Sequence, residues 1–294
     1  MDTKQKNVRE KLDVDKHLVD NSWEDKSKGL RKEAVDFKFV SVVKSSDLSK
    51  CLVEILEVNN FNPEVQKSNY LLNTEGEFWL DMGHALTAID CYVEEFLKQM
   101  FTNETSKCFI TTKSFGVIDF TVKLKKIEFG GYYCEQPAEK MFELAKSYKE
   151  NGVQMFKEFP LFAHNYFNLA AKCLLSFNPF DDIETDSPLK KSDFLELLQN
   201  IYLNIAACLV KENRYDDILH VLSYTITQEN PSEKAVYRLA LAYFHLKQFD
   251  SAKNIIERIN YKNNKDLVQL MAKIQEHWKV DNDRYSSMVK KMFA

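Results

Sequence analysis

Residues 204–217 read NIAACLVKENRYDD, and residues 238–251, which lie 34 positions further on, read RLALAYFHLKQFDS. Both stretches have an alanine at their third position, Ala206 and Ala240, and an aromatic residue at their twelfth. Small residues at a fixed place in a repeat allow two helices to pack closely against each other. The offset therefore predicts a repeat of helical pairs in the second half of the chain.

A period of about 34 residues is typical of the tetratricopeptide repeat (TPR), a helical pair that stacks on its neighbours. A divergent first copy is predicted around Gly152, and its second helix has Ala163, Phe167 and Ala170 in helical spacing. Three repeats are the usual minimum for a stable stack. We expect a capping C-terminal helix after the third copy, because the end of a stack has to be covered. Its predicted apolar stripe consists of Leu267, Leu270, Met271, Ile274 and Trp278.

The first half of the chain has a different texture, because β-rich runs alternate with polar clusters from residue 36 onward. Residues 86–100 interrupt these runs with a helical period of apolar side chains. The predicted fold class is α+β, an antiparallel sheet with one helix followed by an all-α TPR solenoid of three repeats and a capping helix. The predicted strands are FKFVSVV at 37–43, KCLVEILEV at 50–58, NYLLN at 69–73, EFWLDM at 77–82 and VIDFTVKLKKIEF at 117–129.

The sequence divides into three segments by composition. Residues 1–35 are about half charged and are predicted to form a flexible tail, because such a composition cannot repay the entropy of ordering. The β domain is predicted over 36–130 and the TPR domain with its C-terminal helix over 131–294. The only Gly-Gly pair, in GGYYCEQPAEK at 130–140, marks the boundary between them.

Composition argues against several classes of protein. The formal net charge is −4 without a long basic run, which disfavours nucleic-acid binding. The histidines have no metal-ligand spacing and there is no phosphate-binding loop, so we expect neither a metal nor a cofactor. The six cysteines are scattered without a C-x-x-C motif, which favours free thiols in a reducing compartment. No apolar run reaches about 18 residues, so we expect no membrane-spanning segment and a cytoplasmic, or also nuclear, location.

The chain resembles the large FKBP-type immunophilins with a TPR domain over about residues 36–294. FTVKLKKIEF at 120–129 is similar to the last strand of their FKBP domain, and AEKMFELAKSYKENGVQMFK at 138–157 to the helix leading into their first repeat. YSSMVKK at 285–291 is similar to the end of their last helix. The resemblance implies that the predicted β domain has an FKBP-like fold.

Catalytic members of this family are prolyl isomerases, which hold the substrate proline on a tryptophan floor beneath a long flap. Met100 matches the methionine that closes the family helix, so Val93 or Tyr92 stands where the tryptophan would be. The segment KSFG at 113–116 has only the length of a hairpin turn, so the flap is missing. Because this catalysis depends on apolar walls around the proline, the resemblance implies a silent domain. An active peptidyl-prolyl cis-trans isomerase is the alternative.

TPR domains of this family often have a carboxylate clamp, five side chains that bind chaperone tails ending in Met-Glu-Glu-Val-Asp. Lys149, Asn204, Lys234 and Arg238 match four of the five positions, and Val153 occupies the fifth, where the family has asparagine. The alternative is a solvated helix edge, because cations one turn apart are common on surfaces.

The resemblance implies an adaptor or co-chaperone rather than an enzyme. Within the family, the likeness is to a non-catalytic member whose partner is a casein-kinase-I-type kinase of the circadian clock. The sequence leaves both a monomer and a homodimer open.

Overall fold

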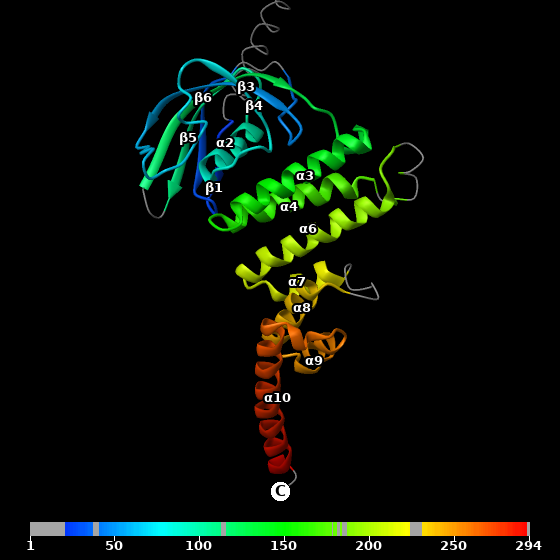
Figure 1. The fold of residues 1–294 in the computed structure, drawn as a ribbon. Coiled ribbons are helices and arrows are strands. Elements are labelled where there is room, and N and C mark those ends of the chain that lie inside the picture. Colours follow the sequence, from blue (N-terminus) through cyan, green and yellow to red (C-terminus); the bar gives the residue numbers. More distant parts are fainter. Residues whose placement is uncertain are drawn as a thin grey trace, which may run out of the picture. The chain divides into compact units, whose positions relative to one another are not determined.

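The computed structural model describes residues 21–37, 41–112, 116–177, 179–180, 183, 187–223 and 231–292. The chain forms two compact units, Met1–Gln136 and Pro137–Ala294 (Figure 1). The first contains a β-sheet with one helix, and the second is a stack of helices. The predicted α+β fold class is therefore confirmed.

The first unit is an antiparallel sheet with the strand order β1-β2-β5-β6-β3-β4 in the described part of the chain. Helix α2, Ala88–Gln99, covers one face of this sheet (Figure 1). The strands are β1 Trp23–Asp25, β2 Leu30–Phe37, β3 Lys50–Asn59, β4 Glu77–Asp81, β5 Glu104–Thr112 and β6 Gly116–Glu128.

The core of this unit lies between α2 and the sheet. Along β6, Ile118, Phe120, Val122 and Leu124 are buried, while the residues that alternate with them face the other side of the sheet. Val93, Phe96 and Leu97 of α2 complete the same apolar cluster. Burial at every second residue of the strand and at helical spacing on α2 confirms both predicted periods.

The sequence prediction for residues 1–35 is wrong where the structure describes them, because β1 and β2 belong to the sheet. The Trp23 ring contacts Phe96 edge to face, with 6.0 Å between centroids, and Leu30 is buried. Lys32 also points into this interior. A charged residue on the buried face makes the sequence of β2 resemble that of a solvent-exposed segment. The rest of the predicted tail, residues 1–20, lies outside the described residues.

Two of the predicted strands are also wrong. Of the strand predicted at 37–43, only Phe37 lies in a strand, as the last residue of β2. Residues 41–43 lie outside any strand, and residues 38–40 are outside the described residues. Residues 69–73 form a turn rather than a strand. Leu71 is nevertheless buried and Tyr70 packs against the same core, so the core contacts of a loop gave this segment its strand-like composition.

The second unit stacks three helical pairs in chain order, α3 with α4, α6 with α7, and α8 with α9 (Figure 1). Ala206 and Ala240 are fully buried, as their place in the repeat predicts. Gly152 lies where α3 meets α4, and a Cβ atom there would be only 2.6 Å from Cε1 of Phe167. The helices are α3 Ala138–Met155, α4 Pro160–Leu175, α6 Lys191–Lys211, α7 Tyr215–Ser223, α8 Glu233–His245, α9 Phe249–Glu257 and α10 Lys265–Met292.

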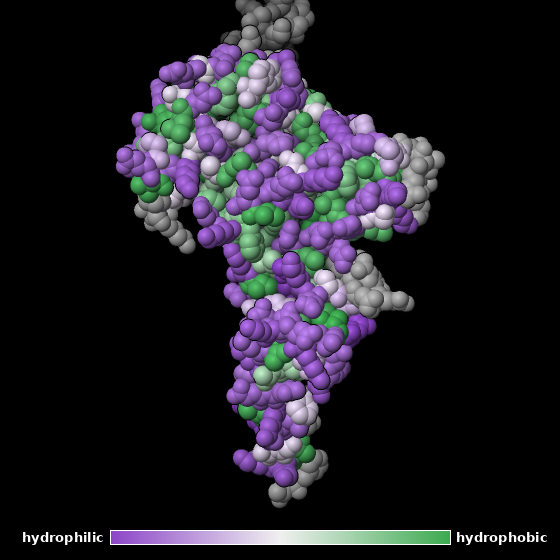
Figure 2. Space-filling model, viewed as in Figure 1, coloured by the Kyte–Doolittle hydropathy of each residue, from purple (hydrophilic) through white to green (hydrophobic). Residues whose placement is uncertain are grey.

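Helix α10 covers the end of the stack and then continues beyond it. Leu267, Leu270, Met271 and Ile274 are buried as predicted, but Trp278 is 45% exposed. The apolar stripe loses its partners after Ile274 because α8 and α9, against which α10 packs, are much shorter helices. Figure 2 shows a mainly hydrophilic surface over α10 with isolated apolar side chains.

The length and hydropathy of helix α6 do not fit the expectation that no segment could span a membrane. Among the described residues it alone has the length and hydropathy to do so, and half of its most apolar window is buried inside the stack. Such burial is what the core helix of a folded unit shows, and α6 packs against α4 and α7.

Candidate functional site

The start of α2 is the place where the family resemblance puts a substrate floor, and buried carboxylates organise it. Thr87 caps the helix, since its Oγ1 accepts a hydrogen bond from the N–H of Asp90 at 3.1 Å. The buried Asp90 carboxylate accepts bonds from Ser68 Oγ at 2.5 Å and from the N–H groups of Asn69 and Tyr70 at 2.9 and 3.1 Å. These bonds hold the turn that contains Leu71 against the helix.

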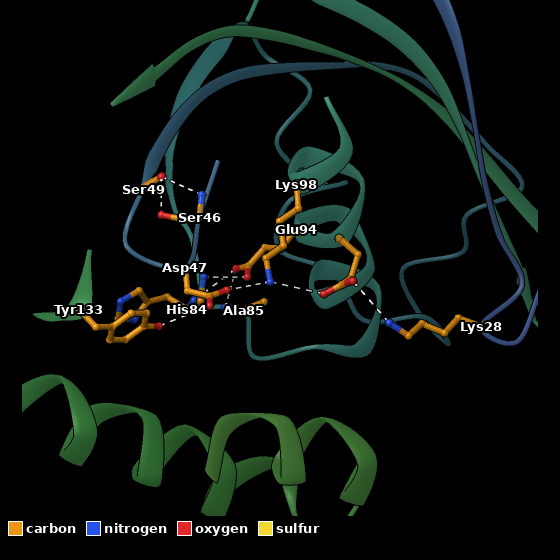
Figure 3. Close-up of polar contacts among 11 residues, drawn as sticks. Lys28, Ser46, Asp47, Ser49, His84, Ala85, Glu94, Lys98 and Tyr133 are labelled. Carbon is orange, nitrogen blue, oxygen red and sulfur yellow. Dashed lines mark hydrogen bonds and ion pairs between the residues drawn. The ribbon is translucent and has the colours of Figure 1, made fainter. Parts of the chain in front are cut away.

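Glu94, one turn further along α2, holds the segment that follows β4. Its carboxylate accepts a bond from the N–H of Ala85 at 3.0 Å (Figure 3). It also accepts bonds from the N–H of Gly83 at 2.8 Å and from Tyr70 Oη at 3.2 Å. Burial raises the pKa of Glu94 to about 7, although the hydrogen bonds and the Lys98 ammonium favour its charged form. Both oxygens of this carboxylate thus accept hydrogen bonds from the protein itself.

Ion pairs link α2 to neighbouring segments of the same unit (Figure 3). Lys98 Nζ lies 2.9 Å from Asp47 and 3.5 Å from Glu95, which also pairs with Lys28 at 3.4 Å. Tyr133 Oη donates to Asp47 at 3.4 Å, from the short helix η1, Tyr133–Glu135. These contacts connect α2 with the β1–β2 turn and with the last residues of the unit.

Val93 and Tyr92 are the two residues that the family resemblance puts at the floor position, and Val93 is completely buried in the core. Tyr92 beside it is half-buried and packs against the edge of the same core. Thr112 of β5 pairs with Gly116 of β6, so only three residues join the two strands where the family flap would be. The structure thus describes a buried valine and a half-buried tyrosine at the predicted floor, and a hairpin connection between β5 and β6.

In the helical unit, the predicted peptide-binding residues lie on the first helices of the three pairs. Lys149 is on α3, Asn204 on α6, and Lys234 and Arg238 on α8, and α6 contacts both α3 and α8. Among the described residues, none of the four side chains bonds directly to another. We refer to these four residues on α3, α6 and α8 as the groove, after the peptide-binding site that the family resemblance predicts there.

Two contacts define how the helices of the groove align. Lys211 Nζ, at the end of α6, donates to the carbonyl of Phe156 at 2.8 Å and lies 4.0 Å from the centre of its ring. The second is longer in range, because Arg238 of α8 lies within electrostatic reach of Cys208, one helical turn beyond Asn204 on α6. Sequence reasoning missed Lys211, although its position seven residues after Asn204 puts it on the same face of α6.

Arg238 is a cation without an acidic partner. Its Nη1 is buried and has no hydrogen-bond partner among the described residues. Burial lowers the pKa of the guanidinium, and no described carboxylate pairs with it. A buried donor without an acceptor costs about 1–3 kcal/mol. An anion arriving beside Arg238 would meet a charge that the fold itself leaves uncompensated.

The described residues show no other reactive centre. No group of three or more His, Cys, Asp or Glu side chains in these ranges is arranged to hold a metal ion. All six cysteines are free thiols, of which Cys134 is exposed and Cys91 is half-buried. The remaining four, Cys51, Cys108, Cys173 and Cys208, are buried.

Three family models match the chain. A model for the BDBT FKBP-like N-terminal domain matches residues 23–129, and one for the Bride of doubletime-like TPR domain matches residues 137–220. A general tetratricopeptide repeat model matches residues 201–274. The first match begins at β1, so the strands missed by sequence analysis belong to the FKBP-like domain.

Individual proteins show the same relationship. The yeast peptidyl-prolyl cis-trans isomerase CYP7 of Saccharomyces cerevisiae is 27% identical over 164 residues, covering 50% of this chain and 40% of its own length. A crystal structure of residues 1–211 of CG17282 is 37% identical with a TM-score of 0.58, covering 66% of this chain and 96% of the other. Protein Bride of doubletime of Drosophila melanogaster is 37% identical over 283 residues, covering 94% of this chain and 99% of the relative. The chain therefore belongs to the Bride of doubletime family of FKBP-like TPR proteins.

Proposed function

We propose that the chain is a non-catalytic adaptor that binds protein partners. Isomerisation of a prolyl bond needs an enclosed apolar pocket that desolvates and positions the twisted amide. With Val93 or Tyr92 in place of the floor tryptophan and three residues joining β5 to β6, the proposal is that the FKBP-like domain does not enclose a substrate proline. A protein-binding role fits a domain whose fold is kept while its reaction site is changed.

The observation that carries the proposal is the unpartnered Arg238 guanidinium in the groove. Together with Lys149, Asn204 and Lys234 it offers charge-assisted donors to an acidic peptide, each bond contributing about 1.5–3 kcal/mol. This exceeds the repulsion of about 0.2–0.5 kcal/mol between Lys234 and Arg238, one turn apart on α8. Neither Lys149 nor Lys234 forms an ion pair with a described residue, so the charges remain available.

Two kinds of partner follow from the family relationship. One is the C-terminal tail of a heat-shock chaperone, ending in Met-Glu-Glu-Val-Asp, bound by the groove as a co-chaperone would bind it. The other is a casein-kinase-I-type circadian kinase such as Doubletime, to which the name of the Drosophila relative refers. Both partners place the protein in the cytoplasm or the nucleus.

The groove is tested by titrating a Met-Glu-Glu-Val-Asp peptide into the full chain and measuring the heat of binding. Lys234→Ala should weaken binding at least about tenfold, because it removes one charge-assisted contact. Lys273→Ala, which removes an exposed lysine of α10, is the matched control and should leave the affinity unchanged. No binding by the wild type, or equal binding by the wild type and Lys234→Ala, would exclude the groove as an acidic-peptide site.

The adaptor role is tested in two further measurements on the full chain. In a proline-peptide isomerisation assay, the rate should equal that of the uncatalysed reaction, and a clearly faster rate would overturn the non-catalytic assignment. In size-exclusion chromatography, a purified casein-kinase-I-type kinase should elute together with the chain. Separate elution at micromolar concentrations of both would exclude a stable complex with that kinase.

A further inference from the structure

Val153 on α3 occupies the one position of the predicted clamp that has no hydrogen-bond donor in its side chain. It is 56% exposed and lies one turn after Lys149, so its methyl groups face the solvent beside a cation. The next half-buried residue towards the end of α3 is Phe156, whose ring lies under the Lys211 ammonium. This end of the groove is therefore an apolar strip with a lysine at each end.

A chain-terminal carboxylate is a poor match for this strip. Its two oxygens need several converging donors, and each oxygen that loses water without gaining a donor raises the free energy of the complex. Asn204 supplies one amide, whereas Val153 supplies none and would displace water from the ligand. The lysines and Arg238, by contrast, attract any negative charge at longer range and do not require a free chain end.

Side chains of an internal acidic segment fit the same surface better. Lys149 and Val153 are separated by about 6 Å along α3, the rise of one helical turn. An extended peptide advances about 3.3 Å per residue and points alternate side chains to one side. An acidic and an apolar side chain two positions apart can therefore contact Lys149 and Val153 together. A further acidic side chain could reach Arg238, whose buried Nη1 has no hydrogen-bond partner in the described part of the chain.

We infer that the groove binds an internal acidic segment of its partner, with an acidic and an apolar side chain two positions apart, and does not depend on a C-terminal carboxylate. This inference rests on the proposed function, because it assigns the ligand class of the same groove. It makes Val153 a residue that determines specificity, because it removes the preference for a chain end and favours an apolar side chain.

The test uses Met-Glu-Glu-Val-Asp in two N-acetylated forms, one with a free C-terminal carboxylate and one with a C-terminal amide. Both forms contain a glutamate two positions before the valine. For the wild type, amidation should change Kd by less than about threefold, as expected for a screened charge without a direct contact. A loss of tenfold or more on amidation would overturn the inference while leaving the acidic-peptide groove in place.

Val153→Asn provides the reciprocal measurement. Placing an amide at this position should strengthen binding of the free-acid peptide about tenfold or more, and amidation of the peptide should then remove that gain. A peptide with serine in place of valine should bind the wild type more weakly but should bind Val153→Asn unchanged. Equal behaviour of both proteins with all three peptides would contradict a selective role for Val153.

The experiments distinguish a failure of the proposed groove from a failure of the inferred ligand class. If no form of the peptide binds the wild type, or if Lys234→Ala has no effect, the groove itself is excluded. If binding is present and sensitive to Lys234→Ala but requires the free carboxylate, only the inference about the ligand fails. Helical circular dichroism and the melting temperature of each variant show whether the helical unit is intact, which the exposure of Val153 leads us to expect.

Discussion

The ammonium group of Lys32 pairs with the carboxylate of Glu104 inside the FKBP-like domain, and neither side chain has any exposed surface. Glu104 also accepts bonds from Asn21 Nδ2 at 2.7 Å and from the N–H of Phe101 at 2.9 Å, and Ser106 Oγ donates to it at 2.6 Å. The pair therefore joins β2 to β5 and holds the residues before β1, with every charged atom supplied with partners.

Removing one member of this pair should be strongly destabilising. Lys32→Met leaves the Glu104 carboxylate buried without its counter-charge, so we expect a loss of about 3–5 kcal/mol in the free energy of unfolding. Urea unfolding followed by Trp23 and Trp79 fluorescence, in a Trp278→Phe background, reports on this domain alone. Lys26→Met, which changes an exposed lysine, is the control and should have little effect.

The double variant Lys32→Met/Glu104→Gln separates the lost charge from lost packing. Because it removes both charges, it should recover a large part of the stability that Lys32→Met loses. Additive losses from the two substitutions would contradict the description of Lys32 and Glu104 as one coupled unit.

Glu94 should make the stability of the FKBP-like domain depend on pH. Burial raises its pKa in the folded state to about 7, from an ordinary value of 4.5. The folded state therefore binds the proton more tightly than the unfolded state, so this contribution is complete below pH 4.5 and is lost as the pH rises to about 7. Urea midpoints measured from pH 4.5 to 8 should show wild type losing stability relative to Glu94→Gln through this window. Parallel curves for the two proteins would exclude Glu94 as the source of any pH dependence.

Gly152 should not tolerate alanine, although alanine is the better helix former by about 1 kcal/mol. A Cβ atom there would lie within 3 Å of three atoms of the buried Phe167 ring, and overpacking of this kind costs about 1–3 kcal/mol. We expect Gly152→Ala to lower the melting temperature followed by helical circular dichroism. Adding Phe167→Leu, which shortens the obstructing side chain, should reduce the penalty of the alanine. The exposed neighbour Gln154→Ala is the control, and a stability of Gly152→Ala equal to that of Gln154→Ala would refute the steric argument.

Cys134 should be the most reactive thiol of the folded protein. It is exposed, whereas burial raises the pKa of the Cys51 and Cys208 thiols to about 12, which leaves almost no thiolate near neutral pH. Brief treatment with iodoacetamide followed by peptide mass spectrometry should find the label first on Cys134. The Cys134→Ser variant should lose this fast phase, and rapid labelling of Cys51 or Cys208 without denaturant would contradict the assignment.

Regular patterns made part of this structure predictable. Strand β6 alternates buried and outward residues along its length, and the 34-residue offset aligns Ala206 with Ala240, so both elements follow from local periodicity. Strand β2 could not be found in this way, because Lys32 puts a charge on the buried face and the pairing register shifts between Ala34 and Asp36. Apart from the three-residue β1, its partner strand is β5, which lies far along the chain and outside any short window of sequence.

The candidate site, like the fold, could be predicted from the sequence only in part. The placement of Asn204 and Arg238 on successive first helices follows from the repeat, which puts them at equivalent positions. The burial of Arg238 Nη1 depends on side chains from neighbouring helices and has no signature in its own sequence. Glu94 and Glu95 are adjacent acids of one helix, yet the first is buried and the second is partly exposed, a difference that only the fold creates.

The strand order has a consequence for the nascent chain. Leu30 pairs with Ile110, 80 positions later, so the edge of β2 that does not pair with β1 stays open until most of the FKBP-like domain has left the ribosome. At about 5–20 residues per second, that wait lasts roughly 4 to 16 s. During this time a hydrophobic strand edge and an uncompensated Lys32 are open to misassociation, and closing so distant a contact is intrinsically slow. The helical pairs, whose partners are neighbours in sequence, can form as they emerge.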